Sequence, residues 1–471
     1  MGSLSGLFDL SRSALMADQA GLNATANNVA NQNTAGYTKQ VASFTAGDIV
    51  TLTGGANSTL QSSTGPQATI SAVRDRVLEQ RIQQQTQAQA SCSAESDVLT
   101  QIQDVFSVSG STASTGSTQI GTALNSFFSS LTALAGNPTS TATQQGVLSA
   151  ASVLASTLNS AATQLQTVAN TVTGAVNSSV MAVNALSTTI AGLNKQISEV
   201  SPHGDAGALE DQRQLAITQL SQYVGLDQIR TENNGITLTT QGGSVLVQGG
   251  TASALKMATV NGAAAILDSS GTNITAGVQG GSIGGQITAQ SVDLPAATTA
   301  LDALAFQVAT LVNTQNQAGL TTAGVAGAAI FSVPASATGC AATISVIPTN
   351  PNAVATAAVG EGESGNGNAA ALANVATTVD TTGQTVAGRL GAMLARIGST
   401  ASRLQLQATT QQATLTQLTT QRNSLSAVSL DTEAANLSQY QKSYEAAAQL
   451  LTVLDKLMAT AMNIGTQTTV T

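Results

Sequence analysis

The sequence contains few aromatic and few charged residues. Of its 471 residues, 2% are aromatic, none is tryptophan, and 8% are charged, whereas charged residues make up about a quarter of an average soluble domain. Aromatic side chains dominate most compact cores and small-molecule pockets. Their scarcity favours long, narrow packing seams filled by Ala, Leu, Val and Ile, and therefore an extended helical body.

Positive charge and long hydrophobic runs are also scarce. Lys and Arg together number 15 and the net charge is −9, so the chain lacks the basic patch that binds nucleic acid phosphates. Because no run of about 18 apolar residues is present, no membrane insertion is predicted. The N-terminus has neither a basic leader nor a continuous apolar segment, so no cleaved signal peptide is predicted.

The residue types that usually build catalytic and metal centres are rare. The two cysteines, Cys92 and Cys340, form no CxxC pair, and His203 is the single histidine. Metal sites and Ser-His-acid triads need several such residues close together. The glycine runs match no phosphate-binding loop, and "GEGESGNGN" at 360–368 matches no calcium loop. The sequence therefore predicts no catalytic residue, no cofactor and no metal ion, and we expect the protein not to be an enzyme.

A small group of charged residues surrounds the start of a predicted helix at 209–225. Carboxylates stabilise the first turn of a helix, and exposed ion pairs are common on helix surfaces. These residues are therefore interpreted as helix-start charges and surface pairs: Asp205, Glu210, Asp211 and Arg213.

Seven-residue apolar repeats are abundant, and one lies at each end of the chain. Such spacing is typical of a helix that packs along a neighbour. At the N-terminus the repeat is Phe8, Leu15, Leu22 and Val29, with Leu4 adjoining it. At the C-terminus it is Leu430, Leu437, Tyr444, Leu451 and Met458, with Tyr440 and Leu454 three residues beyond members of the ladder.

An asparagine-rich segment follows the first repeat. Asparagine tolerates left-handed backbone angles and caps neighbouring groups, and glycine adopts the same backbone geometry without strain. The N-terminal helix is therefore expected to end between Asn28 and Asn33, before Gly36 and Tyr37.

The interior of the chain is predicted to be mainly helical. Helices are expected at about 73–106, 120–134 and 209–225. The repeats at 141–200 and 390–425 are expected to pack on one another and on the 73–106 helix as an antiparallel bundle. Residues 47–66 are interpreted as a loop or weak strands. "GITLTTQGGSVLVQGG", residues 235–250, alternates apolar and polar residues around Gly-Gly, which predicts a β-hairpin. Glycine-rich strands are expected to continue to about residue 289. A helix is expected to follow, with Leu301, Leu304, Phe306, Val308 and Val312, and then an irregular stretch to about 368.

Several of these segments match a known family. "LNATANNVANQNTAGYTKQ" at 22–40 resembles the N-terminal signature of bacterial flagellar axial proteins, which form the rod, hook and hook-associated structures. "SLDTEAANLSQYQKSYEAAAQLL" at 429–451 resembles their C-terminal helix. "LEDQRQLAITQLSQYVGLDQI" at 209–229 and the segment 281–320 are similar to the hook-associated protein 1 family. The resemblance covers most of the chain in the right order.

The resemblance implies an α+β, mainly α fold that is elongated and has three domains. Terminal coiled-coil helices (1–60 and 426–471) would form a core assembly domain, and 61–224 with 369–425 a helical rod domain. A central β-rich outer domain would span 225–368, with a long helix at about 290–316. The additional outer domain that larger members insert between 320 and 370 is expected to be absent.

The resemblance also implies a function in the bacterial flagellum. The protein would be a structural component that joins hook to filament, would lie outside the cell, and would leave through the flagellar type III export apparatus. Its implied partners are further copies in a helical ring, the hook protein, the second junction protein (hook-associated protein 3) and an export chaperone on the C-terminal helix. The implied subunit-interaction residues are Leu4, Phe8, Leu15, Leu22, Asn27, Asn28, Val29, Asn31, Gly36, Tyr37, Leu430, Leu437, Tyr440, Tyr444, Leu451, Leu454 and Met458.

Two other readings remain open at this point. A hook or distal-rod subunit would share both terminal segments but lack the transition from the "DQR" helix to strands. An extracellular coiled-coil adhesin would instead build its rod as a parallel trimer and would need no matching C-terminal repeat.

Overall fold

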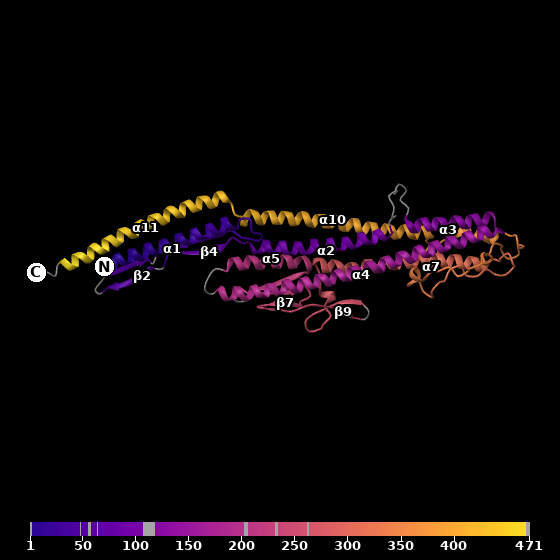
Figure 1. Ribbon diagram of the computed structural model, residues 1–471, viewed down its shortest axis with the longest axis horizontal. Helices are drawn as coiled ribbons and strands as arrows, with labels where there is room; N and C mark the ends of the chain where they lie inside the picture. Colours follow the sequence, from indigo (N-terminus) through magenta and orange to yellow (C-terminus); the bar gives the residue numbers. More distant parts are fainter. Residues whose placement is uncertain are drawn as a thin grey trace.

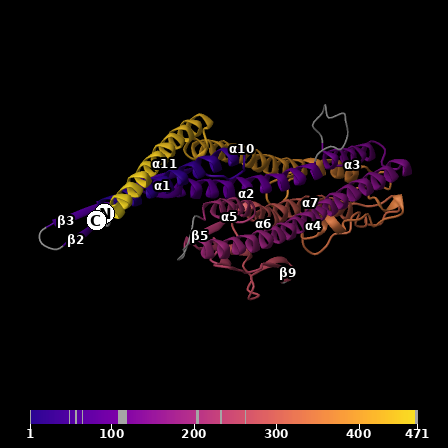
Figure 2. The same ribbon diagram turned by 60° about the vertical axis from the view of Figure 1, so that its left-hand side comes forward.

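The protein is long and narrow, and its chain folds back so that both termini lie at one end (Figures 1 and 2). The computed structural model describes residues 2–47, 49–54, 58–63, 65–106, 118–201, 206–230, 234–260 and 263–467. The predicted α+β, mainly α class and the elongated shape are confirmed. His203 and Asp205 lie outside the described residues.

Five long or medium helices build the rod. They are α2 (Arg76–Phe106), α3 (Gln119–Gly136), α4 (Thr141–Val200), α5 (Gly207–Tyr223) and α10 (Val386–Ser426). The predicted 141–200 helix is confirmed over its full length. Its apolar side chains recur every three or four residues and are buried along the whole helix, as for Leu158, Val176 and Ile197.

The partners of these helices differ from the prediction in one respect. α10 lies along α2 and also contacts α7 (Leu294–Ala318), while α4 packs on α3 and α5. The expected packing of 390–425 on the 73–106 helix is confirmed, but the expected pairing of 141–200 with 390–425 is wrong. Leu99 and Ile102 of α2 line one small cavity together with Met393 and Ile397 of α10. The apolar face of α2 thus covers the stripe on α10 that was expected to meet α4.

A four-stranded antiparallel sheet lies beside the rod (Figure 1). Its strands are β5 (Leu226–Arg230), β6 (Ile236–Thr240), β7 (Val245–Gln248) and β8 (Thr251–Ala252), and β9 (Lys256–Val260) pairs with β10 (Ala263–Leu267). The predicted hairpin is confirmed as β6–β7, in which Leu238 pairs with Val247.

The segment after β10 is helical rather than extended, so the expectation of strands to about residue 289 is wrong. A 3₁₀ turn, η1 (Thr275–Gly277), precedes α6 (Gly281–Thr288), which runs through a π-helical turn, η2 (Ala289–Asp293), into α7 (Leu294–Ala318). The glycines of α6 allow its backbone to approach α2 closely. A Cβ on Gly285 would lie 2.1 Å from the carbonyl oxygen of Ser91.

The stretch after α7 contains only short helices, but side chains of α7 fix it in place. These helices are α8 (Cys340–Thr343), η3 (Pro351–Ala353), α9 (Gly367–Asn374) and η4 (Val375–Thr377). Asn313 accepts hydrogen bonds from the backbone N–H groups of Ile330 and Phe331. Asn316, which is fully buried, donates to the carbonyl of Ala328 and accepts from the N–H of Ala355.

The two chain ends form an elongated pair of helices at one end of the rod. α1 (Gly2–Asn31) and α11 (Leu430–Gln467) lie side by side (Figure 1). β1 (Gln40–Thr45) pairs with β4 (Gln67–Ala72), and β2 (Ile49–Gly54) pairs with β3 (Ser58–Ser63). Of the two interpretations of residues 47–66, a loop or weak strands, the strands are confirmed. α1 ends within the predicted range.

One apolar core runs continuously from the helices of the rod through α7 to the β5–β8 sheet. The division into terminal, rod and outer domains stays a prediction. Among the described residues, Gly281–Ala318 is long and apolar enough to cross a membrane, but half of its most apolar window is buried inside the protein. Cys92 and Cys340 are free and buried, as expected for inert thiols.

Candidate assembly site

The pairing of α1 with α11 rests on small residues. Ala17 and Ala24 of α1 are almost fully buried. Between them, a Cβ on Gly21 would lie 3.0 Å from the ring of Tyr440. Tyr440 also packs against Phe44 of β1, with ring centroids 5.8 Å apart. The small strip on α1 therefore seats an aromatic ring of α11.

The predicted apolar repeats meet only in part. Phe8, Leu15 and Leu22 of α1 are half-buried, as are Leu437 and Leu451 of α11, and Leu454 is buried. Other members of the two repeats remain exposed in the single chain: Val29, Leu430, Tyr444 and Met458. The side chain of Leu4 lies outside the described part of the chain.

A second apolar row on α11 was missed from the sequence. Leu450, Val453 and Leu457 are 49%, 55% and 52% exposed. Leu450 and Leu457 are seven residues apart and each precedes a member of the predicted repeat, so a second ladder was the available signal. On α1, Leu7 and Met16 are similarly exposed. The paired helices thus keep apolar surface on faces that no described residue covers.

Asn28 is the central residue of the asparagine-rich segment. It is 1% exposed. Its Oδ1 accepts hydrogen bonds from the Tyr37 hydroxyl (2.9 Å) and the Gln40 backbone N–H (2.8 Å). Its Nδ2 donates to the Gln40 carbonyl (2.8 Å) and to Glu433 Oε2 (3.1 Å). Asn28 therefore closes the turn after α1 and ties it to α11.

Asn27 and Gly36 have different surroundings from Asn28. Asn27 is exposed, and its carbonyl accepts a hydrogen bond from the half-buried Asn31 side chain (3.0 Å). Gly36 has a φ of +82°, and a Cβ there would lie 3.3 Å from Leu215 of α5. The assignment of these residues to contacts between subunits stays a prediction.

Glu433 carries a carboxylate into the contact between the termini. It is 1% exposed, and its Oε1 lies 3.3 Å from the Lys39 ammonium. Burial, with contributions from Glu433 and Asp18, raises the pKa of Tyr440 above its usual value. The base of α11 therefore contains a buried carboxylate in an ion pair and, further along the helix, a half-buried tyrosine whose pKa is raised.

The charges of the "DQR" segment are buried rather than on the surface, which corrects the interpretation of Asp211 and Arg213. Asp211 accepts a hydrogen bond from the Thr38 backbone N–H (2.9 Å) and another from Arg74. Arg213 is 2% exposed. It donates to the side chain of Asn194 (2.9 Å), and also to the carbonyl of Asn234 (2.7 Å). Glu210 is half-buried.

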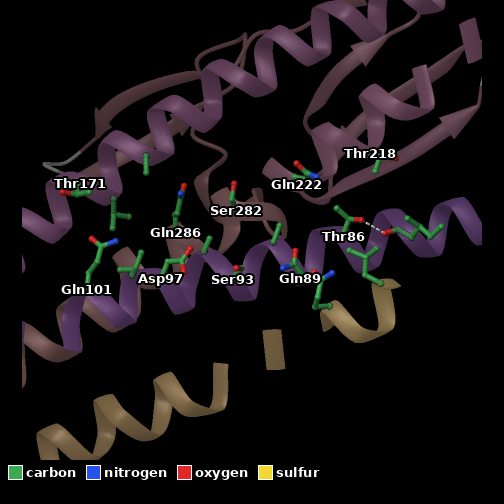
Figure 3. Close-up of a pocket in the computed structure, with 18 of the residues that line it drawn as sticks. Thr86, Gln89, Ser93, Asp97, Gln101, Thr171, Thr218, Gln222, Ser282 and Gln286 are labelled. Atoms are coloured by element: carbon green, nitrogen blue, oxygen red, sulfur yellow. Dashed lines mark hydrogen bonds between the residues drawn. The ribbon is translucent and has the colours of Figure 1, made fainter. Parts of the chain in front are cut away.

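A large open trough lies between α2, α4, α5, α6 and α10, and both polar and apolar side chains line it (Figure 3). Its volume is about 710 Å³. Its polar lining consists of amides and hydroxyls such as Gln89, Ser93 and Gln286, with Asp97 as its single ionisable residue. Across the described residues, no cluster of His, Cys, Asp and Glu could hold a metal ion. The trough offers hydrogen bonds but no catalytic constellation.

Comparisons with known proteins identify the family. The profile of the flagellar hook-associated protein FlgK helical domain matches residues 99–331. Those of the flagella basal body rod protein and of the FlgEFG C-terminal region match 8–38 and 420–464. The chain is 29% identical to flagellar hook-associated protein 1 of Bacillus subtilis (strain 168) over 97% of each protein. It is 31% identical to that of Escherichia coli (strain K12) over 70% of this chain and 60% of the relative.

A solved structure supports the fold. The flagellar hook junction protein FlgK from Burkholderia pseudomallei superposes with a TM-score of 0.65 over 74% of this chain and 100% of that one. The sequences of the two chains are 17% identical. The relatives and the three profiles, which match in order along the sequence, show that this chain belongs to the flagellar hook-associated protein 1 (FlgK) family.

Proposed function

We propose that this chain forms the junction between hook and filament and couples the two mechanically. Membership of the family gives it a structural, hook-associated role in the flagellum. The observation that carries the finer proposal is the uncovered apolar row on α11, together with the exposed Leu7 and Met16 of α1. Water-exposed apolar rows of this kind mark protein–protein contacts. Copies that pack side by side as a helical ring would bury them.

The proposed partners follow from the same surface. The hook protein and the second junction protein, hook-associated protein 3, would meet the ring at its two ends. Before assembly, a flagellar export chaperone would cover the apolar row of α11. The chain would reach the outside of the cell through the flagellar type III apparatus.

The adhesin reading has less support. A parallel trimer would need an apolar seam on the outside of the rod, but the stripe of α4 is buried within the single chain at Leu158, Leu165 and Val183. Because that stripe already packs on α3 and α5, it leaves no second seam for other copies to share.

Electron microscopy of cells that lack this chain tests the proposed function. We expect hooks without filaments, and filament subunits released into the medium. Re-expression of the complete chain should restore filaments. Normal filaments on the deleted strain would contradict the junction role.

A further inference from the structure

We propose that five residues at the base of the terminal helix pair form a lock that sets one angle between that pair and the rod. The inference rests on the proposed function, since a mechanical coupler transmits force only if its parts keep their relative orientation. The lock consists of Asn28, Tyr37, Lys39, Gln40 and Glu433, whose contacts join α1 and α11 to residues 37–40, and Thr38 within that segment reaches the rod.

The three consecutive residues 38–40 each contact a different part of the molecule. The backbone N–H of Thr38 donates to Asp211 of α5, which anchors the segment to the rod (2.9 Å). The Lys39 ammonium pairs with Glu433 of α11. The backbone N–H of Gln40 donates to Asn28 of α1 (2.8 Å). The rod, α11 and α1 are therefore fixed to one extended segment, and none can turn without breaking its contact.

The same segment also fixes the break between α10 and α11. The backbone N–H of Lys39 donates to the carbonyl of Ser426, the last residue of α10 (3.0 Å). The carbonyl of Lys39 accepts from the N–H of Val73 (2.8 Å), and the Ser426 hydroxyl donates to the Val73 carbonyl (2.8 Å). Only residues 427–429 separate α10 from α11. The kink between these helices is thus held from both sides.

The burial of Glu433 makes the lock selective for one geometry. A carboxylate removed from water is strongly disfavoured unless a cation and hydrogen-bond donors remain in place. Lys39 and Asn28 supply them, and both sit on the chain that follows or ends α1. A different angle would leave a buried charge without its partners. The joint therefore has one preferred position rather than a continuous range.

Distances between spin labels across the joint test the lock. Labels are placed on cysteines introduced at the exposed positions Thr414 of α10 and Gln449 of α11, in a background with both native cysteines changed to alanine. Glu433→Gln removes the ion pair but keeps an acceptor for Asn28. Glu445→Gln is the matched control, because it removes an exposed carboxylate from the same helix. Lys39→Met and the Lys39→Met/Glu433→Gln double variant complete a double-mutant cycle for the ion pair.

The measurement uses flagella isolated from cells in which labelled chain is diluted with unlabelled chain. We expect a narrow distance distribution for the unchanged chain and for Glu445→Gln. Both single variants should lose the narrow peak, and the double variant should be no broader than either. If a variant does not incorporate into flagella, its distance distribution is measured on the purified full chain. It is then compared with that of the purified unchanged chain.

The outcomes separate the lock from the junction role. If the labelled unchanged chain incorporates and Glu433→Gln keeps the same narrow distribution, the lock is wrong while the junction role stands. A broad distribution for the unchanged chain in flagella also overturns the lock. Failure of the unchanged chain to incorporate at the hook end instead overturns the proposed function.

Discussion

The oxygen and the nitrogen of the Asn28 side-chain amide both form hydrogen bonds within the chain. Two donors reach its Oδ1 and its Nδ2 donates twice, all from a residue that is 1% exposed. An amide of this kind satisfies backbone and side-chain groups without introducing a charge. A short uncharged side chain therefore suits this buried position at the end of α1.

Replacing Asn28 by alanine should loosen the turn after α1. The change leaves the Gln40 N–H and carbonyl without their side-chain partner, and buried groups left unpaired destabilise by about 1–3 kcal/mol each. Hydrogen exchange measured by mass spectrometry should show faster exchange over residues 28–45. Asn27→Ala is the control, because the Asn27 side chain is exposed. Equal exchange in both variants would count against this role.

Tyr440 should make the helix pair sensitive to alkaline pH. Burial raises its pKa above the ordinary 10.0, so the folded state holds the phenolic proton more tightly than the unfolded state. The associated stability is complete below that ordinary value and is lost as the pH rises through the raised pKa. Ultraviolet absorbance should show one tyrosine ionising late, together with loss of helical circular dichroism. Tyr440→Phe should remove both changes, and their persistence would exclude Tyr440 as the source.

Asp211 and Arg213 show where sequence reasoning stops at the residue scale. Their spacing at a helix start correctly predicted α5. Their burial depends on partners far away in the sequence, since Thr38 is 173 residues from Asp211 and Asn234 is 21 residues from Arg213. A local pattern of charges contains no information about such partners, so the two residues could not be distinguished from surface charges.

At the scale of the element, the helices of the rod were predictable because their signal is local. The seven-residue repeat of α4 gave its bounds, whereas the choice between α2 and α4 as the neighbour of α10 depends on the assembled core. The outer face of α4 is rich in threonine, which is a weak helix former. Thr163, Thr167 and Thr171 each donate their hydroxyl to the carbonyl four residues earlier. These bonds satisfy the hydroxyls within the helix itself.

The contact between α6 and α2 should tolerate no side chain at Gly285. A methyl group there would lie 2.1 Å from the Ser91 carbonyl, so the helices would have to separate. Overpacking of this kind typically destabilises by about 1–3 kcal/mol. Urea unfolding of Gly285→Ala should show that loss.

Gly174→Ala on α4 is the control for Gly285→Ala. Apart from the adjoining backbone of α4 itself, no heavy atom of the described residues lies within 4 Å of the added methyl group. The higher helix propensity of alanine should therefore stabilise by up to about 1 kcal/mol. An equal loss of stability in the two variants would show that the α6–α2 contact is not tight.

The apolar row of α11 should be needed for assembly but not for folding. Val453→Ser/Leu457→Ser removes two exposed apolar side chains from that row. We expect normal circular dichroism and no filaments in cells that carry this variant alone. The matched control is Val153→Ser/Leu406→Ser, which makes the same changes at residues on the rod helices α4 and α10 that are at least as exposed. Filaments on cells with the α11 variant would refute the row as an assembly surface.

At the scale of the whole molecule, the order of the segments could be predicted and their mutual contacts could not. The terminal repeats and the central hairpin were visible because each has its own period. The irregular stretch after α7 has none, and its form depends on Asn313 and Asn316 binding backbone groups of distant loops. For the same reason the lock at the base of α11 could not be inferred, although Asn28 and Tyr37 were singled out.

Removing residues 430–471 should separate folding from assembly. In the described structure, the main helical neighbour of α11 is α1, and of its described side chains only Glu433 and Leu454 are buried. The apolar core of the rod contains no residue of α11. The truncated chain should therefore keep the thermal unfolding transition of the rod, measured by circular dichroism. In cells it should leave hooks without filaments, because the paired helices cannot form. Filaments that grow from hooks carrying only the truncated chain would show that α1 and the rod suffice for the junction.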